Sequence, residues 1–198
     1  MLQKKHWIVT SLCIVIMLGG LWVGYTQQDI TNEPAVGDLQ PDLVTDCVIR
    51  EVELTVSGHS MTGLVEDGEQ LKAQFGYYDC TSVKRDDWVL YRFGNQRSYV
   101  KVVRGLYPDH FAIEPSTTGQ GWHIRVNNTV LTNSTGQPFV LEAHKGKQLR
   151  DEAKLYQGQI PRGKFLIMGN LLEGSHDSSW YGLINRDQLL AKIVNLPQ

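Results

Sequence analysis

Two short segments of this sequence carry residues that can act together as a nucleophile and its base. Ser60 lies in the segment SGHSMTG, and Lys101 lies in the segment YVKVV. A serine hydroxyl is a poor nucleophile unless a base takes its proton, and lysine is such a base only when neutral. Burial among apolar groups lowers the pKa of lysine from about 10.4. In a strand, Tyr99 and Val103 share the face of Lys101, so its ammonium would point into an apolar surface.

Other interpretations of these segments are structural. SGHSMTG contains ordinary turn residues, and a lone lysine on a strand is commonly exposed. A Ser-His-Asp triad is disfavoured because His176 and Asp177 are adjacent, and adjacent side chains in an extended chain point to opposite faces. His59 adjoins Ser60 and has the same difficulty. The six His and three Cys form no ligand-spaced cluster, so neither a metal nor another cofactor is expected.

Four segments resemble, in order and spacing, the blocks of the type I signal peptidase family. They are SGHSMTG (57–63), DWVLY (87–91), YVKVVRGL (99–106), and a last block that runs from IPRG (160–163) through MGN (168–170) to GSHDSSWYG (174–182). The resemblance implies a serine-lysine dyad in which Ser60 is the nucleophile and Lys101 the general base. It also implies a mainly β, signal-peptidase-like catalytic domain.

The resemblance extends to three supporting residues. Ser175 matches the family serine that hydrogen-bonds the catalytic lysine, which implies that it orients Lys101. Asp177 matches an acidic residue of the same block and is expected to be structural. Gly58 occupies a position where many relatives carry a hydroxyl that stabilises the oxyanion. A glycine there lets the backbone pass close to a substrate, while the Ser60 N–H would be one oxyanion donor and the second stays unassigned.

The sequence departs from the family pattern at several positions. Gly63 replaces a usual proline, and Ser179 replaces an arginine. Val102 and Asn170 replace an arginine and an aspartate that are thought to pair in relatives. Replacing both partners of a buried ion pair can be neutral, so we expect a repacked core. These changes indicate a specialised branch, such as the peptidases of conjugation or secretion systems that mature one substrate, for example a pilin.

The N-terminal region predicts a membrane anchor. Residues 7–25 carry no charge and would span about 28 Å as a helix, close to the thickness of a bilayer core. Lys4 and Lys5 precede this run, so the N-terminus is expected in the cytoplasm. A cleaved signal peptide is the alternative, but the run is long and no A-x-A site follows it. The predicted organisation is a cytoplasmic tail (1–6), a signal anchor (7–25), a linker (26–45) and a peptidase domain (46–198) on the outer, periplasmic face of the cytoplasmic membrane.

The body of the chain has the alternating pattern of β-strands. Strands are predicted over 47–56, 87–93, 98–106 and 164–168, together with a hairpin over 122–132 that turns at Asn127 and Asn128. Residues 186–194 read either as the only helix of the body or as a turn followed by a strand. The expected fold is mainly β, with small packed sheets or a partly closed barrel behind one transmembrane helix.

The charge of the sequence argues against nucleic-acid binding. The formal net charge is −2, and the scattered basic residues form no stripe that would bind nucleic acid. Cys47 and Cys80 could form a disulfide in an oxidising compartment, which their spacing leaves open. The predicted function is a membrane-bound endopeptidase whose partners are exported precursors or a prepilin, and the lipid bilayer. An inactive relative that binds export substrates is one alternative; a self-cleaving stress repressor is another, but it would need a DNA-binding module. No oligomeric state is indicated.

Overall fold

The computed structural model describes residues 47–94, 97–117, 119–142 and 144–195. The predicted signal anchor (7–25) and linker (26–45) lie outside these residues. In the part of the chain that is described, no helix is long and apolar enough to cross a membrane. The fold is mainly β, as predicted, and its larger sheet curls into a half-barrel.

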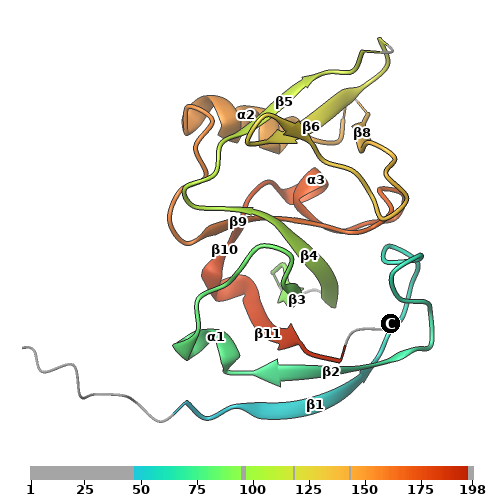
Figure 1. Cartoon of the computed structure of the whole chain (residues 1–198), viewed down its shortest axis with the longest axis vertical. Coiled ribbons are helices and arrows are strands. Elements are labelled where there is room, and N and C mark those ends of the chain that lie inside the picture. Colours follow the sequence, from blue (N-terminus) through green and yellow to red (C-terminus); the bar gives the residue numbers. More distant parts are fainter. Residues whose placement is uncertain (1–46, 95–96, 118, 143, 196–198) are drawn as a thin grey trace, which may run out of the picture. The chain divides into compact units, whose positions relative to one another are not determined.

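The larger sheet has seven strands in the order β1-β2-β11-β3-β4-β9-β10, with antiparallel pairing throughout (Figure 1). Strand β4 pairs with β3 over its first half and with β9 over its second half. The strands are β1 (Arg50–Thr55), β2 (Gln70–Phe75), β3 (Trp88–Arg92), β4 (Ser98–Leu106), β9 (Lys164–Met168), β10 (Ile184–Asn185) and β11 (Leu189–Ile193).

Alternation of apolar side chains gives this sheet two buried faces. Leu71, Leu90 and Val102 contribute to one apolar cluster, whereas Val89 and Val103 contribute to another. Neighbouring residues of β3 and β4 therefore enter different cores, as a period of two requires. The predicted strands at 98–106 and 164–168 are confirmed with the bounds expected from the sequence.

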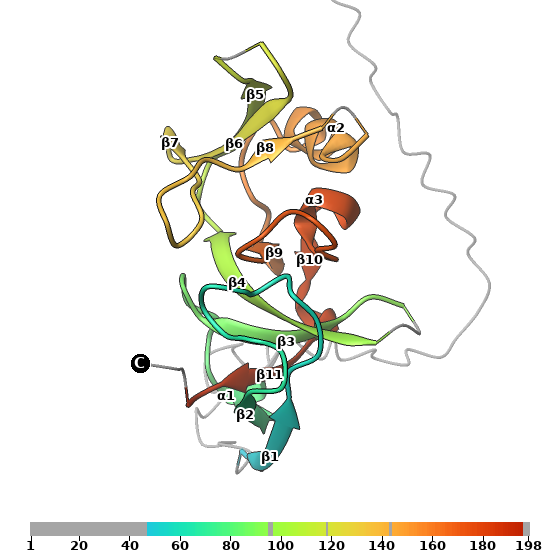
Figure 2. The same cartoon turned by 90° about the vertical axis from the view of Figure 1, so that its right-hand side faces the viewer.

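A smaller four-stranded sheet contains β5 (Phe111–Pro115), β6 (Trp122–Val126), β7 (Thr129–Val130) and β8 (Val140–Leu141). The predicted hairpin is confirmed: Asn127 and Asn128 turn the chain between β6 and β7 with φ angles of 48° and 66°. Figure 2 shows this sheet and α2 (Lys147–Leu155) grouped together at the top of the view, above β9. Phe111, Ile124 and Leu166 share the apolar cluster that joins the two sheets.

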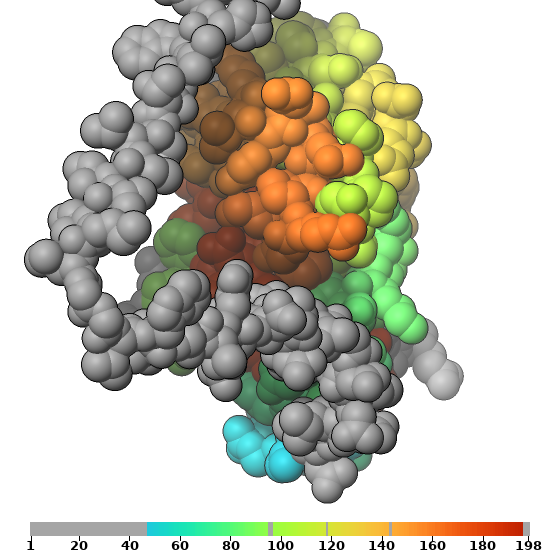
Figure 3. Space-filling view, turned by 90° about the vertical axis from the view of Figure 1, so that its left-hand side faces the viewer, coloured from blue at the N-terminus to red at the C-terminus, as the bar shows by residue number. Residues whose placement is uncertain are grey.

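Of the two alternatives for residues 186–194, the turn followed by a strand is confirmed and the helix is not. Those residues form a single 3-10 turn, η1 (Arg186–Gln188), followed by β11, because the apolar side chains are needed between β2 and β3. The longest helix of the described residues is instead α2, which the sequence reading missed. Leu149 anchors it in the core while its other side lies at the surface (Figure 3).

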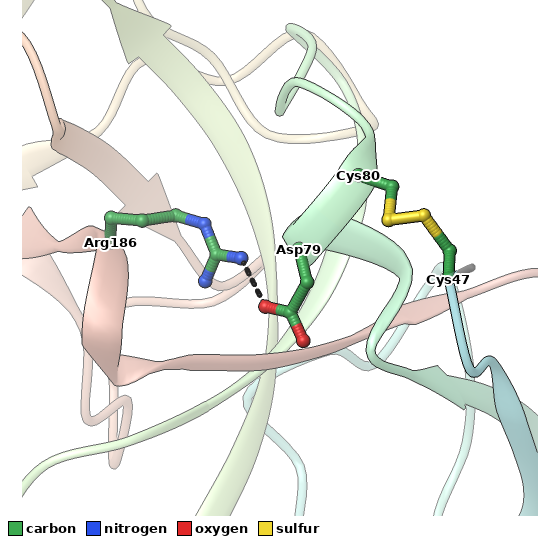
Figure 4. The surroundings of a disulfide bond; sticks show 4 residues. All are labelled: Cys47, Asp79, Cys80 and Arg186. Atoms are coloured by element: carbon green, nitrogen blue, oxygen red, sulfur yellow. Dashed lines mark hydrogen bonds and ion pairs between the residues drawn. A yellow bond between two sulfur atoms is a disulfide. The ribbon is translucent and has the colours of Figure 1, made fainter. Parts of the chain in front are cut away.

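Two further short helices flank the larger sheet, α1 (Tyr77–Cys80) and α3 (Ser178–Tyr181). Cys80 at the end of α1 forms a disulfide with Cys47, and their Cα atoms are 6.0 Å apart (Figure 4). Beside it, Arg186 forms an ion pair with Asp79 at 3.0 Å. The question that the spacing of the cysteines left open is therefore answered by their pairing, which ties the start of β1 to α1.

Candidate active site

Lys101 lies in the middle of β4 and is almost fully buried. It pairs with Val89 of β3, and only 1% of its surface is exposed. Its Nζ lies 5.8 Å from the centre of the Tyr99 ring, so the predicted neighbour on its face is indeed beside it. A charged lysine is costly in such surroundings unless it finds partners.

The nearest partner of this lysine is Ser60, in the loop between β1 and β2. Lys101 Nζ and Ser60 Oγ are 2.6 Å apart, within the range of a hydrogen bond, and Nζ also donates to the carbonyl of Val100 at 2.9 Å. A turn closed by the Thr62 N–H and the His59 carbonyl carries Ser60. The two residues that the sequence singles out, which are 41 positions apart, are therefore brought into direct contact.

Burial changes the protonation of this lysine. Loss of solvation lowers the pKa of Lys101 from 10.5 to about 8, and the nearby Asp177 carboxylate opposes that decrease. At pH 7, a group with this pKa is neutral in about one molecule in ten. A neutral amine 2.6 Å from a serine hydroxyl can accept its proton, which is the condition for general-base catalysis.

The turn after β9 holds Ser60 through its backbone. The Ser60 carbonyl accepts hydrogen bonds from the N–H groups of Asn170 at 2.7 Å and Leu171 at 3.0 Å. Gly169 is packed so closely that a Cβ built on it would lie 2.6 Å from Ser175 Oγ and 2.7 Å from the Ser60 carbonyl oxygen. Only glycine fits between the two serines, and the sequence analysis did not identify this requirement.

The side chain of Asn170 joins the same turn to two other loops. Its amide nitrogen donates to the Thr62 carbonyl at 2.7 Å and to Ser134 Oγ at 2.8 Å, while its oxygen accepts from the Ser134 N–H at 2.8 Å. Val102 packs in an apolar cluster with Trp88. Val102 and Asn170 therefore each have partners that suit a neutral side chain, while the repacked core stays a prediction.

Asp177 is fully buried and organises the loop below the lysine. It accepts hydrogen bonds from Ser175 Oγ at 2.5 Å, from the Gly169 N–H at 2.8 Å and from the Ser179 N–H at 2.9 Å. The last of these caps α3, in keeping with the structural role expected of Asp177. The hydrogen bonds found for Lys101 within the described residues go to Ser60 and Val100, so the orienting role of Ser175 stays a prediction.

Gly58 and Gly63 shape the loop on either side of Ser60. Gly58 has φ +108° and donates its N–H to Asp67 Oδ1 at 2.8 Å. Gly63 has φ +86° and donates its N–H to Glu66 Oε1 at 2.8 Å. A proline could adopt neither this angle nor this hydrogen bond, which explains the departure at Gly63. The Ser60 N–H has no acceptor among the described residues and is available to an oxyanion.

A cleft of about 390 Å³ opens beside Ser60 and Lys101. Its walls come from β1, β2, β3, the start of β4 and the Ser60 loop, and about half of the residues that line it are apolar. The apolar members are Leu54, Val56, Met61, Leu71, Phe75, Leu90 and Val100. Such a cleft suits a short extended peptide with small or apolar side chains.

The ring of His176 makes its contacts with tyrosines. The ring of His176 stacks on Tyr99, and its Nδ1 lies 2.8 Å from the Tyr181 hydroxyl. The Tyr91 hydroxyl donates to the His176 carbonyl at 2.5 Å and so fixes the loop that carries Asp177. Within the described ranges, no histidine is hydrogen-bonded to Ser60, and no group of His, Cys, Asp and Glu side chains could hold a metal ion.

Comparison with known proteins shows the family of the chain. The family model described as "Signal peptidase, peptidase S26" matches residues 44–196, and the chain belongs to this family. Signal peptidase IB of Staphylococcus aureus (strain COL) is 28% identical over 142 residues, which cover 70% of this chain and 73% of that protein. Signal peptidase I of Bacillus caldolyticus is 24% identical over 162 residues, which cover 77% of this chain and 86% of that protein.

The solved structures include a similar chain. A signal peptidase I from Enterococcus faecalis V583 aligns with a TM-score of 0.39 and 14% identity, over 58% of this chain and 98% of that chain. Membership of the signal peptidase family makes this chain a peptidase that cleaves signal peptides, with exported precursors as its substrates.

Proposed function

We propose that Ser60 and Lys101 form the catalytic dyad of this peptidase. The observation that carries the proposal is the 2.6 Å approach of Ser60 Oγ to an amine whose pKa burial lowers to about 8. Lys101 takes the proton of the Ser60 hydroxyl as Oγ attacks the scissile carbonyl. The Ser60 N–H then stabilises the oxyanion of the tetrahedral intermediate.

The second half of the reaction reuses the same groups. The lysine ammonium returns the proton to the leaving amine, the peptide C–N bond breaks, and an acyl ester remains on Ser60. Water, losing a proton to Lys101, attacks this ester, and the ammonium then protonates Ser60 Oγ as the acid product leaves. Gly58 keeps the wall of the cleft free of side-chain atoms near the acyl group, and the scheme needs no cofactor.

The edge of β4 offers the substrate a place to bind. β9 pairs with β4 only from Val102 to Leu106, so Ser98 to Lys101 pair on one side with β3 and have no partner strand among the described residues on the other. An extended peptide can add to such an edge through backbone hydrogen bonds. The side chains of the peptide would then enter the apolar cleft next to Ser60.

The site is proposed to work on the outer face of the cytoplasmic membrane. The uncharged run at 7–25, preceded by Lys4 and Lys5, supports a single anchor with the N-terminus inside. The neutral Val102 and Asn170 and the Gly63 turn support a branch dedicated to one substrate, such as the pilin of a conjugation system. The disulfide agrees with an oxidising compartment.

The test is the processing of a precursor by the full-length protein in membranes. Wild-type protein should release the leader, whereas Ser60→Ala and Lys101→Ala should lower processing by at least about a thousandfold. A matched control is Ser82→Ala, which changes an exposed serine that does not line the cleft and should leave processing at the wild-type level. Equal processing by the wild type and both dyad variants would reject the mechanism, and no processing by any of them would favour an inactive binding component.

A further inference from the structure

The cleft beside Ser60 carries positive charge that the proposed reaction does not use. Among the described residues that line it are two cations, Arg97 and Lys101, and no carboxylate. Lys101 is buried and held by Ser60, whereas Arg97 is exposed. Asp67 touches the wall only through its hydrogen bond from the Gly58 N–H and does not line the cleft.

No described residue forms an ion pair with Arg97, which lines the cleft. Arg85, Arg104, Arg125 and Arg186, in contrast, each form an ion pair. A guanidinium at a cleft with no ion-pair partner among the described residues can offer its five donors to an incoming group. The group that matches its planar fork best is a carboxylate.

The position of Arg97 relative to Lys101 sets where such a carboxylate would lie. Arg97 directly precedes β4 and lies four residues before Lys101. In an extended chain, residues spaced four apart lie on the same face. Four residues of strand span about 13 Å. A peptide that adds to the edge of β4 is equally extended, so its residue beside Arg97 is about three to five positions from the bond that Ser60 attacks.

We propose that Arg97 is a specificity-determining residue that selects substrates with an Asp or Glu about three to five residues from the cleaved bond. This inference rests on the proposed peptidase function and adds a substrate class to it. A Lys or Arg at the same place is disfavoured, because like charges repel across a cleft in which about half of the lining residues are apolar. The apolar groups beside the scissile bond bind independently of this contact.

The test is a set of peptides that share one cleavable core. Glu, Gln or Lys is placed in turn at each of the third to fifth positions on either side of the bond, and kcat/KM is measured with the full-length protein. Wild type should prefer Glu over Lys by about tenfold on one side of the bond only. Arg97→Glu should reverse this order, measured within that variant as the ratio of kcat/KM for the Glu peptide to that for the Lys peptide.

Arg92→Glu is the matched control. Arg92 is also exposed and lies opposite Ser98 on the same hairpin, but it does not line the cleft. The same change of charge there should leave the Glu-over-Lys ratio within about twofold, because a long-range field falls off over the Debye length. Preservation of the ratio in Arg92→Glu and its reversal in Arg97→Glu would support a direct contact.

Three results would overturn the inference. Equal kcat/KM for the Glu, Gln and Lys peptides at every position would remove it and leave the peptidase function intact. Equal shifts in Arg92→Glu and Arg97→Glu would show that only the overall charge matters. Failure of wild type to cleave the core peptide, in any version, would contradict the proposed function and this inference together.

Discussion

The lowered pKa of Lys101 makes the pH dependence of catalysis a quantitative test. With a pKa of about 8, the amine is neutral in about one molecule in ten at pH 7; with the ordinary value of 10.5 it would be neutral in about one in 3000. Burial therefore increases the catalytically competent fraction about 300-fold. Because the base acts only when neutral, kcat/KM should rise with pH and level off above about 8.

The assay is kcat/KM between pH 6 and pH 10 on a peptide without titrating groups near the cut. The acid limb of log kcat/KM should have a slope of one and a midpoint near 8. A midpoint near 6.5 would point to a histidine as the base, and one near 10.5 to an exposed lysine. Either result would refute the assignment of the buried Lys101 amine as the base.

Removing the charge of Asp177 tests its contribution to the pKa of Lys101. The Asp177 carboxylate raises the pKa of Lys101 against the larger effect of burial. Asp177→Asn keeps the volume of the side chain and removes the charge, so it should move the acid limb to lower pH. Asp151→Asn removes an exposed carboxylate of α2 and should leave the limb in place. An unchanged limb in Asp177→Asn would contradict the electrostatic part of the account.

Three further changes test how the site is built. Lys101→Met should stabilise the fold at pH 7 by about 2 to 3 kcal/mol, since it removes the cost of charging a buried amine. This gain in unfolding free energy should shrink as the pH rises from about 8 to 10.5. In that range the wild-type lysine keeps its proton in the unfolded chain but loses it in the folded protein. Gly169→Ala should lower kcat about a hundredfold, because its Cβ displaces Ser60 or Ser175. Cys47→Ser should cost about 3 to 4 kcal/mol of unfolding free energy, as expected for a bridge between residues 33 apart, and leave kcat/KM unchanged.

Each of these outcomes has a direct check. Denaturant unfolding of Lys101→Met and wild type at pH 7 and pH 10 gives the first, and a pH-independent difference would contradict it. If the Gly169→Ala protein is folded and its kcat equals that of the wild type, the close packing at Gly169 is not needed for catalysis. For the disulfide, wild type treated with a reductant should lose the same stability as Cys47→Ser, and no loss in either would contradict the estimate.

The strands were predictable where one period dominates the sequence. β4 alternates between two cores and β9 is a continuous apolar run, so both had the expected bounds. Residues 186–194 fit both the period of a helix and that of a strand, and only the pairing of β11 with β2 and β3 decides for the strand. α2 was missed because few of its residues are apolar. The Lys147–Asp151 pair, spaced four residues apart, was a local helix signal that could have revealed it.

The site was predictable only as a set of residue types. Ser60 and Lys101 were singled out because four segments resemble the signal peptidase blocks in order and spacing, and because the two residue types suit a nucleophile and its base. The fit of Gly169 between two serines depends on contacts between distant segments of the chain. The same is true of the hydrogen bond from Asn170 to Thr62, which spans 108 positions. Local patterns do not contain this information, since a glycine or asparagine at a turn has many other uses.

The most direct test of the dyad is to detect the acyl group on Ser60. Full-length protein is mixed with an ester peptide substrate, quenched in acid within the first turnover, digested, and analysed by mass spectrometry. Wild type should carry the acyl group on the peptide that contains Ser60, and Lys101→Met should carry little or none at the same time point. An acyl group on another residue, or equal acylation of Ser60 in wild type and Lys101→Met, would contradict the account.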